Sequence, residues 1–234
     1  MSSSDIYKSK DWITEKAFIK KDDYKAMYEQ SISKPDEFWF EQGQRLDWFT
    51  PYTKVRDYSY EKDDLYIKWY EDGELNASYN CLDRHIEKNA DKIAVIWEGD
   101  DPSNSRKITY QELLTEVCKF SNGLKSLGVK KGDRVTIYMP MIPEAAIAML
   151  SCARIGAVHS VVFGGFSPEA LAGRLEDCDS KYIITADEGI RGGKTIPLKE
   201  NVDKAISKIE DFKKCVVVKR TGNAINWDSS IDHW

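Results

Sequence analysis

The chain has 234 residues, of which 41% are hydrophobic, enough for one large domain or one and a half ordinary domains with a substantial core. Its net charge of −5 argues against a protein that binds nucleic acid over its whole surface. No apolar run approaches the roughly 20 residues needed to cross a membrane, and the first five residues lack the pattern of a secretory signal. We therefore expect a cytoplasmic protein without nucleic-acid or membrane partners.

The cysteines and histidines form no pattern typical of a disulfide framework, a metal site or a His-based nucleophilic triad. The five cysteines are odd in number and widely spaced, without a C-x-x-C pair. Most of them fall in apolar segments, where a free thiol behaves as a small hydrophobic group. Because His85, His159 and His233 are not clustered, we predict no metal site and no such triad in this chain.

Residues 1–80 differ in pattern from the rest of the chain. Their aromatic side chains come in short bursts, such as DEFWFEQGQRLDWFTPY and YIKWYEDGELNASYN, separated by charged segments. Bursts of this kind seldom form a separate core, yet rings this large must be buried somewhere. We predict that residues 1–80 form an irregular, aromatic-rich extension of short helices and turns, which packs its rings onto a neighbouring domain.

From residue 81 onwards, apolar runs alternate with helical patterns. The runs rich in β-branched residues predict strands at 92–98, 134–140, 159–163, 181–186 and 214–220. A strand that is apolar on both faces, such as 134–140, is typical of a sheet buried between two layers of helices. Strand and helix alternate at least four times, so we predict an α/β fold in which helices cover a largely parallel β-sheet.

Helices are expected between these strands. Local start signals place the beginnings of three of them near Thr109, Pro143 and Ser167. Thr109 and Glu112 form a capping box, and Pro143 suits the first position of a helix. The apolar face of a fourth helix is marked by Leu198, Val202, Ala205 and Ile209.

The segment DEGIRGGKTIPLK, residues 187–199, directly follows a predicted strand and contains Arg191, Gly192, Gly193 and Lys194. A solvated, glycine-rich turn is the simpler interpretation. The alternative is a flexible loop that presents one guanidinium and one ammonium group to an anionic ligand, which the glycine backbone can approach closely. Loops at the carboxyl ends of parallel strands are where such sheets bind ligands, which favours the alternative.

A Walker A loop is not expected in this segment. Three residues separate Gly189 from Gly193, whereas the pattern requires four. Pro197 also biases Ile196 away from helical dihedral angles, although a Walker A loop must run directly into a helix. An ATPase of this kind is therefore disfavoured.

A second glycine-containing segment, Phe163, Gly164 and Gly165, follows the preceding predicted strand and leads into the helix that begins near Ser167. The two glycines can relieve crowding where strand meets helix, or they can let the backbone approach a ligand. When this segment is considered together with residues 187–199, binding of a ligand becomes the favoured interpretation, because a phosphate ester can lie across both segments.

Three stretches of the chain closely resemble the acetyl-coenzyme A synthetases, the AMP-forming acetate–CoA ligases of the adenylate-forming superfamily. They are SYNCLDRH (78–85), VTIYMPMIPEAAIAMLSCARIGAVHSVVFGGFSPEALAGR (135–174) and ITADEGIRGGKTIPLKENVD (184–203). The motifs EFW and GELNASYN resemble the N-terminal extension of that family. Propionate-activating enzymes share the sheet, but CLDRH, FSPEALAGR and TIPLKENVD are more similar to the acetate enzymes. The resemblance implies that residues 81–234 are the first, incomplete part of the large AMP-binding domain.

The resemblance implies a reaction in two half-steps, with acetate, ATP and CoA as small-molecule substrates. Acetate attacks the α-phosphorus of Mg-bound ATP to give acetyl-adenylate and pyrophosphate, and the CoA thiol then displaces AMP. In this family an Arg-Gly-Gly-Arg/Lys loop contacts the nucleotide end of CoA, and this chain has Lys194 where many relatives have Arg. The CoA-binding residues implied are Arg191, Gly192, Gly193 and Lys194, together with Phe163, Gly164 and Gly165 in the wall beside CoA.

Several parts of that family's catalytic machinery do not occur in this sequence. They are the Thr/Ser/Gly-rich ATP loop, the Tyr-x-Thr-Gly-Asp segment and the catalytic Lys of the C-terminal domain. We therefore expect an N-terminal portion of the ligase that contains no catalytic residue, is inactive alone, leaves Mg to be bound elsewhere, and can self-associate through the apolar surface exposed by truncation. A free-standing module that binds CoA or a partner chain, without chemistry, is the alternative.

Overall fold

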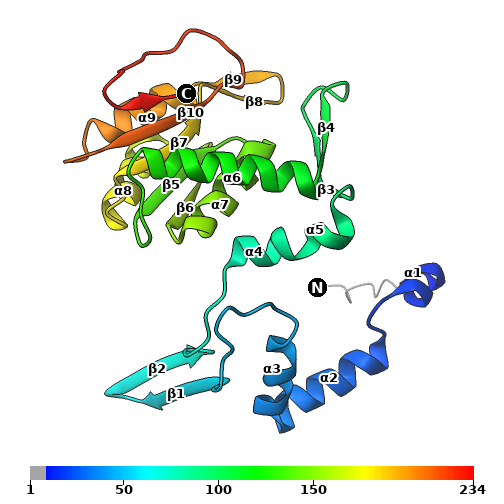
Figure 1. Ribbon diagram of the computed structural model, residues 1–234. Helices are drawn as coiled ribbons and strands as arrows, with labels where there is room; N and C mark the ends of the chain where they lie inside the picture. Colours follow the sequence, from blue (N-terminus) through cyan, green and yellow to red (C-terminus); the bar gives the residue numbers. More distant parts are fainter. Residues whose placement is uncertain (1–8) are drawn as a thin grey trace, which may run out of the picture. The chain divides into compact units, whose positions relative to one another are not determined.

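The structure is a computed structural model and describes residues 9–234 (Figure 1). The chain divides into two compact units, Met1–Glu74 and Leu75–Trp234. Over the described residues, no helix combines the length and the apolar character that crossing a bilayer requires.

Within its described residues, 9–74, the first unit contains three helices and one β-hairpin. The helices are α1 (Asp11–Lys16), α2 (Lys21–Ser33) and α3 (Pro35–Gly43), and the hairpin consists of β1 (Arg56–Glu61) and β2 (Asp64–Trp69). The predicted short helices are confirmed, whereas the β-hairpin was not predicted. The hairpin forms because apolar residues alternate along both strands and meet across them, as Tyr58 opposite Ile67 does.

The aromatic side chains of this unit contact one another around Tyr52. The ring of Tyr52 lies with its centroid 4.9 Å from that of Trp48, 4.6 Å from that of Tyr70 and 5.5 Å from that of Phe40. Its hydroxyl donates a hydrogen bond to the Phe40 carbonyl at 2.5 Å. The rings therefore form a small cluster within the unit, which the sequence analysis did not expect. Their packing onto a neighbouring domain stays a prediction.

The second unit is built on a five-stranded parallel sheet, so the predicted fold class is confirmed (Figure 1). The strand order is β11-β10-β7-β5-β6. The strands are β5 (Arg134–Met139), β6 (Val158–Phe163), β7 (Tyr182–Ala186), β10 (Lys214–Val218) and β11 (Asp232–His233). All five residues of β7 are buried, as expected of an inner strand covered on both faces.

Helices cover both faces of this sheet. α6 (Tyr110–Ser126) and α7 (Pro143–Ile155) contribute to the apolar clusters on one face. α8 (Pro168–Asp177) and α9 (Leu198–Ile206) contribute to the cluster on the other face. The capping box of Thr109 is confirmed, since its hydroxyl accepts the Glu112 N–H at 3.2 Å and its own N–H donates to the Glu112 carboxylate at 2.8 Å.

Two predicted elements differ from the structure. The strand predicted at 92–98 exists as β3 (Ile93–Glu98), but it pairs antiparallel with β4 (Ser105–Thr109) in a separate hairpin. The connection between them is too short for the crossover that a parallel partner requires. The helix face predicted to reach Ile209 ends earlier, because α9 stops at Ile206. Ile209 nevertheless packs against the same apolar cluster. The remaining helices are α4 (Ala77–Cys81) and α5 (Asp83–Asn89).

Candidate functional site

The Arg-Gly-Gly-Lys segment is the turn of a β-hairpin. Its strands are β8 (Gly189–Arg191) and β9 (Lys194–Ile196), and Arg191 pairs with Lys194 across the turn. Gly192 and Gly193 have φ values of +57° and +71°, the left-handed pair that a two-residue turn of type I′ requires. The segment is thus a hairpin and not the flexible loop that was expected. The turn geometry fixes the directions in which the side chains of Arg191 and Lys194 extend from the backbone.

The hairpin also excludes a Walker A loop. Lys194 lies in strand β9, and the next helix, α9, begins only at Leu198. A Walker A lysine lies at the start of a helix, where the backbone N–H groups point at the phosphates. The segment therefore offers no helix N-terminus to an anion, only side chains and the backbone of the turn.

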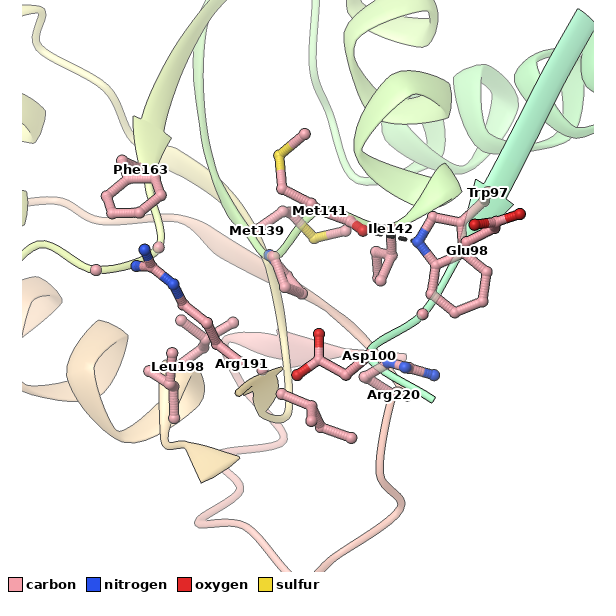
Figure 2. Close-up of a pocket in the computed structure, with 17 residues that line it drawn as sticks. Trp97, Glu98, Asp100, Met139, Met141, Ile142, Phe163, Arg191, Leu198 and Arg220 are labelled. Carbon is pink, nitrogen blue, oxygen red and sulfur yellow. Dashed lines mark hydrogen bonds between the residues drawn. The ribbon is translucent and has the colours of Figure 1, made fainter. Parts of the chain in front are cut away.

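A cavity of about 350 Å³ lies at the carboxyl ends of β5 and β6 (Figure 2). It is lined by residues 97–100, 139–142 and 163–165, by β8 and the start of α9, and by Arg220. β5 leads into α7 on one face of the sheet, whereas the neighbouring β7 leads through β8 and β9 into α9 on the other face. Loops that diverge in this way leave a crevice at the sheet edge, where open α/β sheets bind ligands.

Four of the seven predicted site residues line this cavity together. They are Phe163, Gly164, Gly165 and Arg191. The guanidinium carbon of Arg191 lies 5.5 Å from the centroid of the Phe163 ring, which is cation–π distance. Figure 2 shows the guanidinium of Arg191 reaching towards that ring. The two segments singled out in the sequence are thus joined in space.

The other three predicted residues lie at the tip of the hairpin. Gly192, Gly193 and Lys194 are exposed and do not line the cavity itself. Gly193 is nevertheless linked to the cavity, because its N–H donates a hydrogen bond to the carboxylate of Asp100 at 3.3 Å. An anionic oxygen therefore already occupies one N–H group of the turn.

Space is short around the two glycines of the second segment. A Cβ atom on Gly164 would lie 3.3 Å from the Met139 carbonyl oxygen, and one on Gly165 would lie 2.6 Å from the Phe163 ring. From below, the buried Tyr138 donates its hydroxyl to the Phe166 carbonyl at 2.8 Å and to the Gly164 carbonyl at 3.2 Å. Burial raises the pKa of Tyr138, so the phenol stays protonated and able to donate.

The residues on the other side of the cavity, Trp97 and Arg220, were not predicted from the sequence. Trp97 lies at the end of β3, and its indole N–H donates to the Met141 carbonyl at 2.8 Å. The guanidinium carbon of Arg220 lies 5.1 Å from the centroid of the Trp97 ring. The sequence held one indication of Arg220, which was its position. Arg220 is the last residue of the predicted strand 214–220 and therefore falls at the same edge of the sheet.

A buried carboxylate, that of Asp187, holds the backbone beneath this side of the cavity. It accepts backbone N–H groups from Glu188, Arg220, Thr221 and Gly222 at 2.7–3.2 Å. Burial acts to raise the pKa of Asp187, but the N–H donors outweigh it, and the pKa lies below its ordinary value. The ionised carboxylate therefore fixes the chain as it leaves β10.

Metal ligands are not gathered anywhere in residues 9–234, since no group of three or more His, Cys, Asp or Glu side chains is placed to hold an ion. The cavity is lined by apolar side chains together with two guanidinium groups, two carboxylates and two exposed or half-exposed aromatic rings. Such a set suits a ligand with a flat ring and anionic groups.

Comparisons with known proteins show the family of this chain. The family model "AMP-binding enzyme" matches residues 82–233, and the model "Acetyl-coenzyme A synthetase N-terminus" matches residues 24–81. An acetoacetyl-CoA synthetase from Streptomyces lividans has a similar fold, with a TM-score of 0.79 over 94% of this chain and 34% of that chain, at 24% identity.

Similar curated proteins include acetyl-coenzyme A synthetases from three bacteria. That of Parvibaculum lavamentivorans is 60% identical over 94% of this chain and 34% of its own length. That of Shewanella halifaxensis is 56% identical, and that of Aeromonas hydrophila 57% identical, each over 100% of this chain and 36% of the relative. The chain thus spans about a third of the length of these relatives. It belongs to the AMP-binding enzyme family and corresponds to an N-terminal portion of the acetyl-coenzyme A synthetases.

Proposed function

We propose that the whole protein is an AMP-forming acetate–CoA ligase, which converts ATP, acetate and CoA into AMP, pyrophosphate and acetyl-CoA. The support is the match of both family models along one chain and the identity of 56–60% to relatives of that name. In this proposal, residues 1–80 are the N-terminal extension, and residues 81–234 begin the AMP-binding domain. The protein acts in the cytoplasm.

Within this protein, the cavity holds the nucleotide end of CoA. The observation that carries this assignment is the pairing of Arg191 with the exposed ring of Phe163 at 5.5 Å, beside the tight Gly192-Gly193 turn. The ring of Phe163 offers a face to a purine base, and the guanidinium of Arg191 offers donors to a phosphate group. Lys194, across the turn, adds a second positive charge.

Binding of CoA to the chain tests this assignment, with isothermal titration calorimetry as the measurement. We expect micromolar binding, weakened about tenfold in Arg191→Gln, because a charge-assisted hydrogen bond to phosphate contributes about 1.5–3 kcal/mol. The matched control is Arg174→Gln, since Arg174 also lies on a ring, 4.9 Å from the centroid of Phe166, but outside the cavity. Equal affinities for wild type and Arg191→Gln contradict the assignment.

The chemistry itself belongs to parts of the protein outside this chain. In this proposal, the ATP and Mg site, the acetate pocket and the catalytic lysine lie outside this chain, which spans about a third of the relatives' length. We therefore expect the 234-residue chain to form no acetyl-CoA from acetate, ATP and CoA. Acetyl-CoA production by the purified chain, at the turnover of a full-length ligase measured alongside it, contradicts this expectation.

A further inference from the structure

Arg220 lines the same cavity as Arg191 but comes from a different part of the sheet. It follows β10, whereas Arg191 ends β8. Figure 2 shows Phe163 and Arg191 on one side of the cavity, Trp97 and Arg220 on the other, and Asp100 between them. The two sides thus repeat one arrangement, a guanidinium held against an aromatic ring, at 5.5 Å and 5.1 Å from the ring centroids.

The position of Arg220 is fixed at both ends of the residue. Its backbone N–H donates to the buried carboxylate of Asp187 at 2.8 Å. Its guanidinium lies on the ring of Trp97, and that ring is itself anchored by the hydrogen bond of 2.8 Å to the Met141 carbonyl. A long side chain held in this way loses little conformational entropy on binding a ligand.

The guanidinium groups of Arg191 and Arg220 form no ion pair with a carboxylate in the part of the chain that the structure describes. By contrast, Arg134 and Arg154 each contact an Asp side chain. The Asp100 carboxylate, which lies between the guanidinium groups of Arg191 and Arg220, accepts the Gly193 N–H at 3.3 Å and forms no ion pair with these two groups. Their donors therefore remain available to a ligand.

We propose that Arg220 is a second anion-binding side chain of this cavity and that it takes a different phosphate group from the one that Arg191 takes. This inference rests on the proposed function. The nucleotide end of CoA carries anions at two positions, a 3′-phosphate and a 5′-diphosphate. Arg191, at the end of β8, and Arg220, after β10, then select a nucleotide that is phosphorylated at both positions over one phosphorylated at a single position.

Binding of two ligands to three proteins tests the inference. CoA and dephospho-CoA, which lacks the 3′-phosphate, are titrated against the wild-type chain, Arg191→Gln and Arg220→Gln by calorimetry. We expect each variant to bind CoA about tenfold more weakly than wild type does. With dephospho-CoA, we expect one variant to bind as tightly as wild type, whereas the other still binds more weakly than wild type. Arg174→Gln, which removes a ring-stacked guanidinium outside the cavity, leaves both affinities unchanged.

Two results overturn the inference while leaving the proposed function intact. The first is wild-type affinity of Arg220→Gln for both ligands. The second is that, with dephospho-CoA, both variants bind as tightly as wild type or both still bind more weakly than wild type. In either case the two arginines contact the same phosphate group. Arg220→Lys, which keeps the charge, must recover part of the CoA affinity, and thermal unfolding confirms that each variant is folded.

A third result separates this inference from the proposed function. If the wild-type chain binds neither ligand, the assignment of the cavity to CoA is wrong. Inorganic pyrophosphate, titrated by NMR against the wild-type chain and Arg220→Gln, then decides the inference alone. Binding that Arg220→Gln weakens at least fivefold supports an anion site at Arg220. Absent or unchanged binding overturns it.

Discussion

Gly192 and Gly193 are required by backbone conformation and not by lack of space. Both have positive φ, and a Cβ atom added to either would meet no atom within 4 Å. We expect Gly192→Val to destabilise the hairpin by about 1–2 kcal/mol, whereas Gly192→Asn is tolerated because Asn suits the first turn position of type I′. Hydrogen exchange of the β8 and β9 amides measures the difference. Equal exchange in the Val and Asn variants contradicts this explanation.

The carboxylate of Asp187 links stability to pH. Its pKa is lowered in the folded state, so its contribution to the free energy of unfolding is fully present above its unfolded pKa, about 4, and is lost as pH falls through the lower folded value. We expect Asp187→Asn to cost about 2 kcal/mol at pH 7, because an amide cannot accept all of these N–H groups. The difference from wild type must shrink below about pH 4 in urea unfolding. Asp91→Asn, at an exposed position, serves as the control, and a difference that is constant with pH contradicts the assignment.

At the scale of elements, helix α7 and strand β10 each bury a cysteine. Burial raises the pKa of the Cys152 thiol to about 12 and that of Cys215 well above its usual value. Because the thiolate is the reactive form, we expect a thiol reagent at pH 8 to modify the exposed Cys81 in the folded chain and to reach Cys152 and Cys215 only after unfolding. Mass spectrometry of peptides follows each site. Modification of Cys152 as fast as Cys81 contradicts the described packing.

The elements of the parallel sheet could be predicted because each carries its own signal. The apolar run of β7 and the capping box at Thr109 depend on residues next to one another in the sequence. The β8–β9 hairpin could not be predicted in the same way, since its strands have three residues each and no apolar alternation. The contact of Trp97 with Arg220 joins distant residues on separate elements, and no local pattern reports it.

At the scale of the whole molecule, the outermost strand β6 leaves a face and an edge uncovered. Val158, Val161 and Phe163 are 54–56% exposed on this strand, and β5 is its one partner in the described sheet. An uncovered apolar edge favours pairing with another chain. We expect the chain to self-associate at micromolar to millimolar concentration, as measured by sedimentation velocity, and Val161→Lys to reduce the association. A monomer for both proteins at all concentrations contradicts this.

The central claim is that the glycine hairpin and the segment after β6 form one site for the nucleotide end of CoA. The most direct test is a titration of the ¹⁵N-labelled chain with CoA, followed through the glycine amide signals. We predict saturable shifts for Gly164, Gly165, Gly192 and Gly193, with unchanged signals for Gly128 and Gly222, which do not line the cavity. Shifts confined to glycines outside the cavity and the hairpin, or no shifts at millimolar CoA, contradict the claim.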